Sequence, residues 1–330
     1  MGEDAAGRAQ FARETTADGE FVRQESRFRF CVTADGSSEY RAEPGRYHLY
    51  VSLACPWAHR AIIVRRLKGL EDAISMSVVD PVRDERGWRF GDGPGFGPDP
   101  VNGFRFLSEA YRASDPEFDG RVTVPVLWDR ETGRIVCNES SDLILMLNSQ
   151  FDEWGDADLD LYPASLQPEI DAVNDRVYTY VNNGVYKAGF ATSQRAYERA
   201  FDALFAELDA LEERLATRRY LVGERITLAD WRLFTTLLRF DAVYYAHFKC
   251  NLRRIADYPN LSGFLRELYQ WPGVADTVDF DHIKRHYFVS HDKINPTGIV
   301  PKGPALDLDS PHGRDHLPAA PPVPEAGRAR

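Results

Sequence analysis

The sequence predicts an α/β domain followed by an all-α domain, and three observations support this division. The chain has 330 residues, a length that favours two hydrophobic cores over one. As far as about residue 149, short runs of β-forming residues alternate with segments whose apolar residues recur at helical spacing. From Pro168 onward, long segments are amphipathic with the helical period, so the second domain is predicted to be all-helical.

The first domain is predicted to follow the order β-α-β-α-β-β-α. Its seven elements are expected, in chain order, at residues 47–53, 56–70, 73–80, 106–114, 122–129, 135–138 and 139–149. This order suits a small mixed sheet with helices on both faces, parallel pairing in its first half and a hairpin at its end. Pro125 lacks the amide hydrogen that a central strand needs, and a cis peptide before Pro125, at the strand entrance, would remove the conflict.

The second domain is expected to span residues 163–300. Its amphipathic segments lie at residues 168–183, 196–217, 227–248 and 260–270. Thr227 precedes an apolar run and Asp230 follows three residues later, a pattern typical of a capping box at a helix N-terminus. The other expected parts are an N-terminal extension at 1–46, the α/β domain at 47–155 and a tail at 301–330. Because the tail is rich in proline and glycine and poor in large apolar residues, it is expected to be disordered or loosely wrapped over the protein.

Composition and charge argue against several classes of function. The formal net charge is −11 and no run of basic residues is interleaved with aromatic ones, so nucleic acid is not an expected partner. No apolar stretch reaches the roughly 18 residues of a membrane span, and the N-terminus has no signal or transit pattern, so we expect a cytoplasmic protein. The four cysteines, at positions 31, 55, 137 and 250, show no CxxC spacing, which fits a reducing compartment.

Cys55 is the residue that points most directly to chemistry. It lies where the first strand meets the first helix, so we expect it at the helix N-cap with Pro56 in the first helical position. Amide N–H groups and the helix dipole stabilise a thiolate at that end of a helix. The other three cysteines are interpreted as buried and inert. Ala58 stands where a redox CxxC motif has its second cysteine, so an oxidised Cys55 needs an external thiol, most simply a small one bound in the same site.

Several motifs resemble those of the glutathionyl-hydroquinone reductases, the Xi class of glutathione transferases. They are CPWAHR at 55–60, GW at 87–88, TVPVLWD at 123–129, NES at 138–140, NNGVYKAGFA at 182–191, RFDAVYYAHFKCN at 239–251 and HIKRHYFVSH at 282–291. The resemblance implies a thioredoxin-like N-terminal domain, an all-helical glutathione-transferase C-terminal domain and a homodimer. It also implies that the enzyme reduces a glutathionyl-hydroquinone to the hydroquinone through a mixed disulfide. Glutathione is the implied co-substrate, and another small thiol would suit the same fold.

The resemblance assigns roles to three residues that act on the substrate. Cys55, the cysteine of CPWAHR, is implied to attack the sulfur of the glutathionyl unit. Tyr186 and Tyr287 match family residues at the aromatic substrate pocket. We expect their hydroxyl groups to donate to the ring oxygens from the two ends of the helical domain, because a tyrosine is neutral and protonated near pH 7.

Five further residues are implied to hold glutathione. They are Trp88, Val124, Pro125, Glu139 and Ser140. Trp88 is implied to lie against the ligand, and Val124, before Pro125, to pair its backbone with the cysteinyl unit. Glu139 and Ser140 are implied to bind the γ-glutamyl end. Ser140 lies at a helix N-terminus, which attracts the α-carboxylate, and the Glu139 carboxylate attracts the ammonium group.

Some charged residues have two interpretations at this stage. Arg121 is our candidate for the glycyl carboxylate region of the ligand, although a solvated surface arginine fits equally well. Lys187 would add positive charge nearby. His59, four residues after Cys55, would share its helix face and tune its thiol, yet a helix histidine is more often packed or solvated.

No metal site is expected. Three histidines have a spacing that can hold zinc, namely His282, His286 and His291. Neither an HExxH glutamate nor a cysteine cluster accompanies them, so they are interpreted as structural.

Three other functions compete with the reductase hypothesis. A conjugating glutathione transferase activates its bound thiol with serine or tyrosine, whereas a cysteine in that place forms a disulfide with it. A glutaredoxin-like thiol transferase would act on general mixed disulfides. A non-catalytic binding module would have no need of Cys55, so we place it last.

Overall fold

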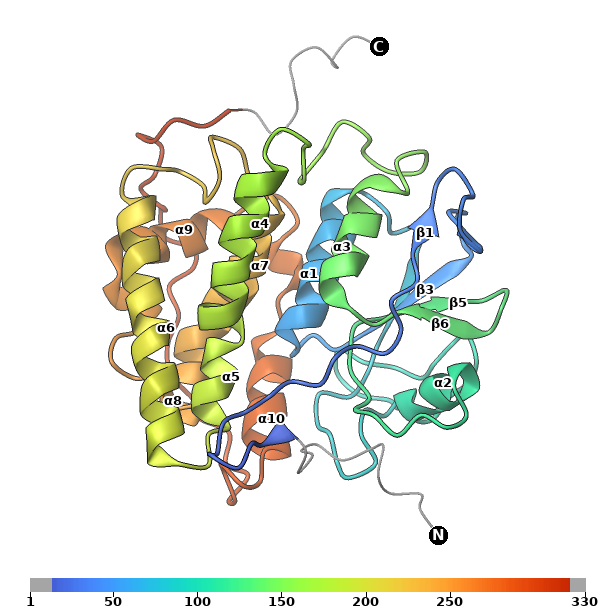
Figure 1. Cartoon of the computed structure of the whole chain (residues 1–330), viewed down its shortest axis with the longest axis horizontal. Coiled ribbons are helices and arrows are strands. Elements are labelled where there is room, and N and C mark those ends of the chain that lie inside the picture. The colour runs from blue at the N-terminus through green and yellow to red at the C-terminus, as the bar shows by residue number, and fades with distance from the viewer. Residues whose placement is uncertain (1–13, 321–330) are drawn as a thin grey trace. The chain divides into compact units, whose positions relative to one another are not determined.

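Residues 14–320 are described by the computed structural model, and they form two units (Figure 1). The first unit contains a mixed sheet and consists of Glu14, Arg23–Ala157 and Thr277–Val300. The second unit consists of Thr15–Val22, Asp158–Asp276 and residues 301–320, and its regular elements within this range are helices. The division into an α/β part and a helical part agrees with the predicted fold class.

A four-stranded mixed sheet forms the centre of the first unit. In spatial order its strands are β4 (Ser75–Val78), β3 (Tyr47–Val51), β5 (Val126–Asp129) and β6 (Arg134–Cys137). β3 pairs with β4 in parallel, whereas β3 with β5 and β5 with β6 are antiparallel. Every residue of β3 and β5 is buried, as expected for strands covered on both faces. The predicted order, with parallel pairing first and a hairpin last, is confirmed.

Helices cover both faces of this sheet. They are α1 (Pro56–Leu67), α2 (Leu107–Ser114) and α3 (Ser140–Ser149). α1 packs against α3, and Figure 1 shows α2 on the opposite face of the sheet from this pair. The Val124–Pro125 peptide bond immediately before β5 is cis, as predicted for the strand entrance.

The N-terminal extension is divided between the two units: residues 23–46 belong to the first, whereas Thr15–Val22 belongs to the second. It contains a short parallel pair, β1 (Val32–Thr33) and β2 (Tyr40–Arg41). Upstream of this pair, Phe30 N–H donates to Val136 C=O at 3.0 Å, and Asn138 N–H donates to Phe28 C=O at 3.0 Å. The extension therefore pairs with β6, whose edge would otherwise present unpaired backbone groups.

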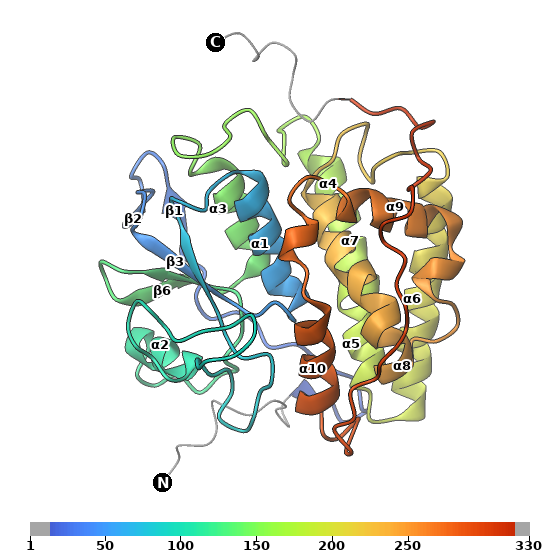
Figure 2. The same cartoon turned by 180° about the vertical axis from the view of Figure 1, so that it is seen from behind.

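The helical unit contains two helices that continue into π-helical turns. Its elements are α4 (Gln167–Arg176), η2 (Val177–Asn182), α5 (Gly184–Gly189), α6 (Gln194–Leu215), α7 (Leu228–Arg239), η3 (Phe240–Tyr244), α8 (Tyr245–His247), η4 (Ile255–Asp257) and α9 (Pro259–Tyr269). η2 continues α4 and η3 continues α7. α5 packs against α6, and α9 packs against α6 and α7 (Figures 1 and 2). The predicted capping box is present, because Asp230 accepts from Thr227 N–H at 2.7 Å.

The predicted helical domain spans residues 163–300 and so includes the last helix. In the structure the last helix belongs to the first unit instead. η5 (Ala275–Thr277) ends where the first unit resumes, and α10 (Phe280–Ser290) follows within that unit. Two hydrogen bonds show why. Thr277 Oγ1 lies 2.8 Å from Nε2 of His59 in α1, and Ser290 Oγ accepts from Arg83 N–H at 2.9 Å.

Of the two expectations for the tail, the loosely wrapped form fits residues 301–320, which contain no helix or strand. Arg314 is 3 % exposed, and its guanidinium donates to Glu267 Oε2 at 3.2 Å and to the carbonyls of Arg218 and Arg219 at 2.8 Å each. In Figure 2 the dark red tail runs over the helices of its unit. A buried arginine with several partners thus compensates for the scarcity of apolar residues. The predictions for residues 1–13 and 321–330 fall outside the described range, and within that range no helix combines the length and hydropathy of a membrane span.

Candidate active site

Cys55 is the N-cap of α1, as the sequence predicts. Its backbone is extended (φ −79°, ψ 122°), and Pro56 follows as the first helical residue. The Cys55 carbonyl accepts from His59 N–H at 3.0 Å and so begins the helical hydrogen-bond pattern. The half-buried Sγ lies 3.5 Å from the carbonyl oxygen of Val124. The thiol therefore lies at the positive end of the helix and beside the backbone that leads into β5.

Two of the other cysteines are unsuited to nucleophilic chemistry. Burial raises the pKa of the Cys137 thiol to about 12, and burial also raises the pKa of Cys250 well above its usual range. Both thiols stay protonated at neutral pH. Cys31 is exposed, so its interpretation as a buried residue is wrong: it lies in the part of the extension that reaches solvent.

Glu139 and Ser140 form the N-terminus of α3. Glu139 is the N-cap, and its Oε1 accepts from the N–H and the hydroxyl of Ser141 at 3.1 and 3.0 Å. Its Oε2 accepts from the hydroxyl of Ser26 at 2.9 Å. Burial raises the pKa of this carboxyl, but the hydrogen bonds from Ser141 and Ser26 and the nearby charge of Arg60 outweigh it, so the pKa is lowered overall. The Glu139 carboxylate is therefore ionised at neutral pH and can accept a hydrogen bond from an ammonium group.

Two side chains contact the ring of Trp88. The guanidinium of Arg83 lies 4.9 Å from the centre of its ring, and the imidazole of His286 lies 4.9 Å away with an angle of 21° between the ring planes. The ring of His286 is itself fixed, because its Nδ1 lies 2.8 Å from the Pro81 carbonyl oxygen. Trp88 is 3 % exposed and therefore has a defined orientation.

Arg121 forms a buried ion pair that the sequence does not predict. Its Nη1 lies 2.8 and 2.7 Å from the two carboxylate oxygens of Glu14. The surface-arginine interpretation is wrong, since the Arg121 side chain is 12 % exposed. Arg83 lies in the same electrostatic environment: burial lowers the pKa of its guanidinium to about 9, and the charges of Arg121, Glu14 and Cys55 act on it as well.

Tyr287 lies in α10 and hence in the same unit as Cys55, not at an end of the helical domain as expected. It is 1 % exposed. Its ring packs edge-on against His286 at 5.2 Å and against His291 at 5.5 Å between ring centroids. His286 therefore contacts both Tyr287 and Trp88.

Tyr186 lies in α5 of the helical unit, directly after the π-helical turn η2. It is 9 % exposed and belongs to a cluster of aromatic rings. Its ring centroid lies 5.4 Å from that of Phe248, 6.0 Å from that of Tyr244 and 6.1 Å from that of Phe190. Packing on several sides fixes the ring.

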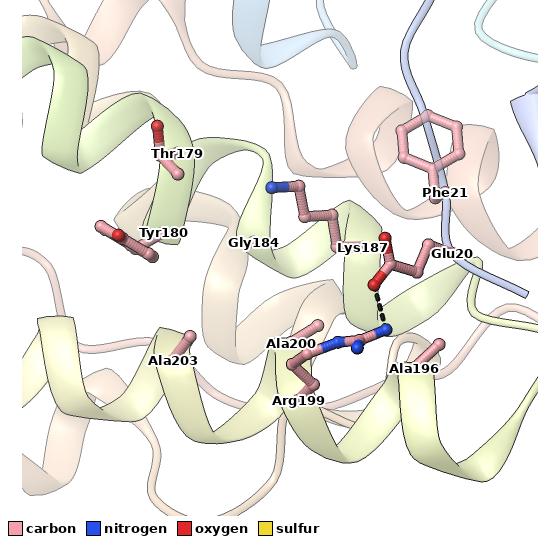
Figure 3. Close-up of a pocket in the computed structure, with 10 residues that line it drawn as sticks. All are labelled: Glu20, Phe21, Thr179, Tyr180, Gly184, Lys187, Ala196, Arg199, Ala200 and Ala203. Carbon is pink, nitrogen blue, oxygen red and sulfur yellow. Dashed lines mark hydrogen bonds and ion pairs between the residues drawn. The ribbon is translucent and has the colours of Figure 1, made fainter. Parts of the chain in front are cut away.

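Lys187 lines a cavity of the helical unit with a volume of about 190 Å³ (Figure 3). Three alanines of α6 form part of the wall of this cavity, and Glu20 and Arg199, which form an ion pair, also line it. Lys187 belongs to the second unit and Arg121 to the first, so their expected proximity stays a prediction.

The histidines have structural partners. His59 is 1 % exposed and its Nε2 bonds the hydroxyl of Thr277 at 2.8 Å, which favours the packed interpretation over a role in tuning Cys55. Nε2 of His282 lies 2.7 Å from the Pro94 carbonyl oxygen. Among residues 14–320, no three side chains of the histidine, cysteine or carboxylate type come together as metal ligands would.

Comparison with known proteins shows the family to which the chain belongs. Residues 54–150 match the profile "Glutathione S-transferase, N-terminal domain", and residues 194–267 match "Glutathione S-transferase, C-terminal domain". The chain is 55% identical over 304 residues to the glutathionyl-hydroquinone reductase YqjG of Escherichia coli (strain K12), which covers 90% of this chain and 93% of that protein. The chain belongs to the glutathionyl-hydroquinone reductase family of glutathione transferases.

Other relatives support the same assignment. The glutathionyl-hydroquinone reductase PcpF of Sphingobium chlorophenolicum is 55% identical over 293 residues, or 89% of this chain and 92% of that protein. The glutathione-bound structure of YqjG superposes with a TM-score of 0.85 over 87% of this chain and 96% of that one. A Xi class glutathione transferase from Natrialba magadii, 48% identical, has a TM-score of 0.88 over 92% and 97% of the two chains. The predicted thioredoxin-like domain and helical transferase domain are thereby confirmed.

Three site residues were missed at the level of sequence. They are Glu14, Ser26 and Arg83. Glu14 and Ser26 come from the extension, where no periodic pattern marks a binding site. Arg83 follows β4 in a charged loop, and nothing in its neighbours indicates that it is buried.

Proposed function

We propose that this protein reduces glutathionyl-hydroquinones, with glutathione as its co-substrate. The observation that carries the proposal is Cys55 at the N-terminus of α1, 3.5 Å from the Val124 carbonyl oxygen and with Ala58 in place of a second cysteine. A thiolate in this position attacks a sulfur atom, and the resulting disulfide can be resolved only by another thiol molecule.

The reaction has two steps. In the first, the Cys55 thiolate attacks the sulfur of the glutathionyl-hydroquinone, a sulfur–sulfur bond forms, and the carbon–sulfur bond breaks. Its electron pair passes to the ring, which takes up a proton and leaves as the hydroquinone. In the second step the thiolate of another glutathione attacks the mixed disulfide, so that glutathione disulfide leaves and the Cys55 thiolate is regenerated. The hydroquinone carbon is reduced and two glutathione units are oxidised to the disulfide.

The ligand's two ends and its backbone have matching groups in the first unit. We assign the cysteinyl backbone to Val124, before the cis bond to Pro125, because the pairing of β5 begins only at Val126. Glu139 would accept from the γ-glutamyl ammonium, and Ser140 at the N-terminus of α3 would receive the α-carboxylate.

The other end of the ligand falls to Trp88 and Arg121. The fixed face of Trp88 would pack against glutathione, and Arg121 would attract the glycyl carboxylate.

Tyr186 and Tyr287 are assigned to the hydroquinone half of the substrate. A bare aryl carbanion is a poor leaving group, so the substrate reacts more readily as its keto tautomer, whose cleavage delivers charge to a ring oxygen. A protonated tyrosine hydroxyl stabilises that charge by donating a hydrogen bond. The aromatic surroundings of both tyrosines favour a flat ring as the ligand.

We further propose that the enzyme is a cytoplasmic homodimer. The four cysteines are all free thiols, which suits a reducing compartment. Tyr178 and Tyr180 of η2 are 36% and 38% exposed, and exposed aromatic rings are common at the centre of interfaces.

One assay tests the proposed reaction. The protein is incubated with a glutathionyl-hydroquinone and excess glutathione, and release of the hydroquinone is followed by chromatography. Cys55→Ser should lower the rate by at least about three orders of magnitude while the protein remains folded, because a neutral hydroxyl is a poor nucleophile toward sulfur. Cys31→Ser, which removes an exposed thiol, should keep the full rate. Near-normal turnover by Cys55→Ser would refute the mechanism.

A further inference from the structure

Glu14 and Arg121 form a buried ion pair at the arginine to which we assign the glycyl carboxylate of glutathione. Arg121 Nη1 contacts both carboxylate oxygens of Glu14, at 2.8 and 2.7 Å. Only 4% of the Glu14 side chain and 12% of the Arg121 side chain are exposed. Gln24 also donates to Glu14 through its Nε2, with a distance of 3.3 Å to Oε1. A carboxylate of the protein's own chain therefore occupies Arg121 in the way that a ligand carboxylate would.

The charges around this pair balance. Arg83 is 8% exposed, and its guanidinium remains protonated at neutral pH because its pKa, although lowered by burial, is about 9. The charges of Arg121, Glu14 and Cys55 also act on Arg83. Two cations thus face one carboxylate and, when Cys55 is ionised, one thiolate.

The catalytic cycle exchanges one negative charge of this group for another. When Cys55 forms the mixed disulfide it loses its negative charge, and the bound glutathionyl unit brings the glycyl carboxylate in its place. With Glu14 present, the group again has two cations and two anions. Without Glu14, the glycyl carboxylate would no longer compete with a protein carboxylate for Arg121 and would be bound more tightly.

We propose that Glu14 is a specificity-determining residue that competes with the glycyl carboxylate of glutathione for Arg121. This inference rests on the proposed function, because it concerns the glutathionyl unit of the substrate. The site recognises this unit at its γ-glutamyl end, through Glu139 and Ser140, and discriminates little at the other end. Substrates whose glycyl end is neutral are then accepted almost as well as the glutathionyl-hydroquinone itself.

The test compares a glutathionyl-hydroquinone with its glycyl monoethyl ester, which lacks the carboxylate charge, and glutathione resolves the mixed disulfide in both cases. The ratio of kcat/KM for the two substrates is measured in the wild type and in Glu14→Gln. The wild type should prefer the glutathione form, with its free carboxylate, by less than about threefold. Glu14→Gln should prefer it by about ten- to a hundredfold, the change expected when a buried arginine gains a charge-assisted hydrogen bond to the ligand.

Glu20→Gln is the matched control. It makes the same chemical change in the N-terminal segment, but Glu20 pairs with Arg199 in the helical unit. Its ratio should equal that of the wild type. Binding of S-methylglutathione and of its glycyl ester, measured by calorimetry, gives the same ratio without any turnover.

The outcomes separate this inference from the proposed function. A wild-type preference for the glutathione form above about tenfold overturns the inference even if Glu14→Gln does not fold. An unchanged ratio in a folded Glu14→Gln also overturns it and indicates that Glu14 only anchors the extension. Failure of the wild type to release hydroquinone refutes the proposed function instead, and the calorimetric ratio still decides the role of Glu14.

Discussion

Replacing Glu139 with glutamine should weaken the binding of glutathione at its γ-glutamyl end. The carboxylate accepts two hydrogen bonds from Ser141 and one from Ser26, and glutamine retains an oxygen that can accept from Ser141. Most of the local structure should therefore survive, and the lost quantity is the negative charge. A hydrogen bond to a charged group contributes about 1.5–3 kcal/mol, so KM for the glutathionyl-hydroquinone should rise by about 10- to 150-fold. The value of kcat should change little, because Glu139 does not touch the reacting sulfur.

The assay compares a glutathionyl-hydroquinone with its deamino analogue, whose glutathionyl unit lacks the γ-glutamyl ammonium. The wild type should discriminate strongly between the two substrates, and Glu139→Gln should not. Asp142→Asn is the control, because Asp142 lies in the first turn of the same helix but pairs with Arg29 at 2.7 Å. Equal losses on both substrates in Glu139→Gln would refute the assignment and indicate a general disturbance of α3.

The same variant gives a test by pH. The pKa of Glu139 is lowered in the folded protein, since its hydrogen bonds outweigh burial. Its ionisation therefore stabilises the fold above the unfolded value of about 4.5, and this contribution is lost as the pH falls through the folded pKa. The difference in the free energy of unfolding between wild type and Glu139→Gln should shrink in that acidic range. Chemical denaturation at a series of pH values measures it, and a constant difference would contradict the argument.

Three further predictions concern other parts of the molecule. Tyr186→Phe and Tyr287→Phe should each lower kcat on glutathionyl-hydroquinone by about 10²–10³ but spare a simple glutathione mixed disulfide, and equal effects on both substrates would exclude the donor role. Burial raises the pKa of Asp230 from its ordinary value of 3.8 to about 6, so the stability of wild type relative to Asp230→Asn should fall as the pH rises from about 4 to 6; chemical denaturation that shows no such trend contradicts this. Sedimentation velocity at micromolar concentration should show a dimer, and a monomer would count against the proposed assembly.

Much of the site was predictable because its signals are local. A strand followed by Cys55 and Pro56 specifies a helix N-cap through hydrogen bonds within one turn. Glu139 before an apolar helical run specifies the N-cap of α3 in the same way. Thr227 with Asp230 specifies the N-terminus of α7. Each of these features depends on residues a few positions apart, so the order of amino acids is enough to indicate it.

The sequence by itself determined the α/β and helical division, the order of strands and helices in the first unit, and the place of Cys55. Only the tertiary structure decided that α10 belongs to the first unit. It also decided that Arg83 and His286 contact Trp88, and that Glu14 forms an ion pair with Arg121. The last pair is separated by 107 positions. Such contacts form when distant segments pack together and leave buried charges that need partners, and no local pattern of propensity or periodicity carries that information.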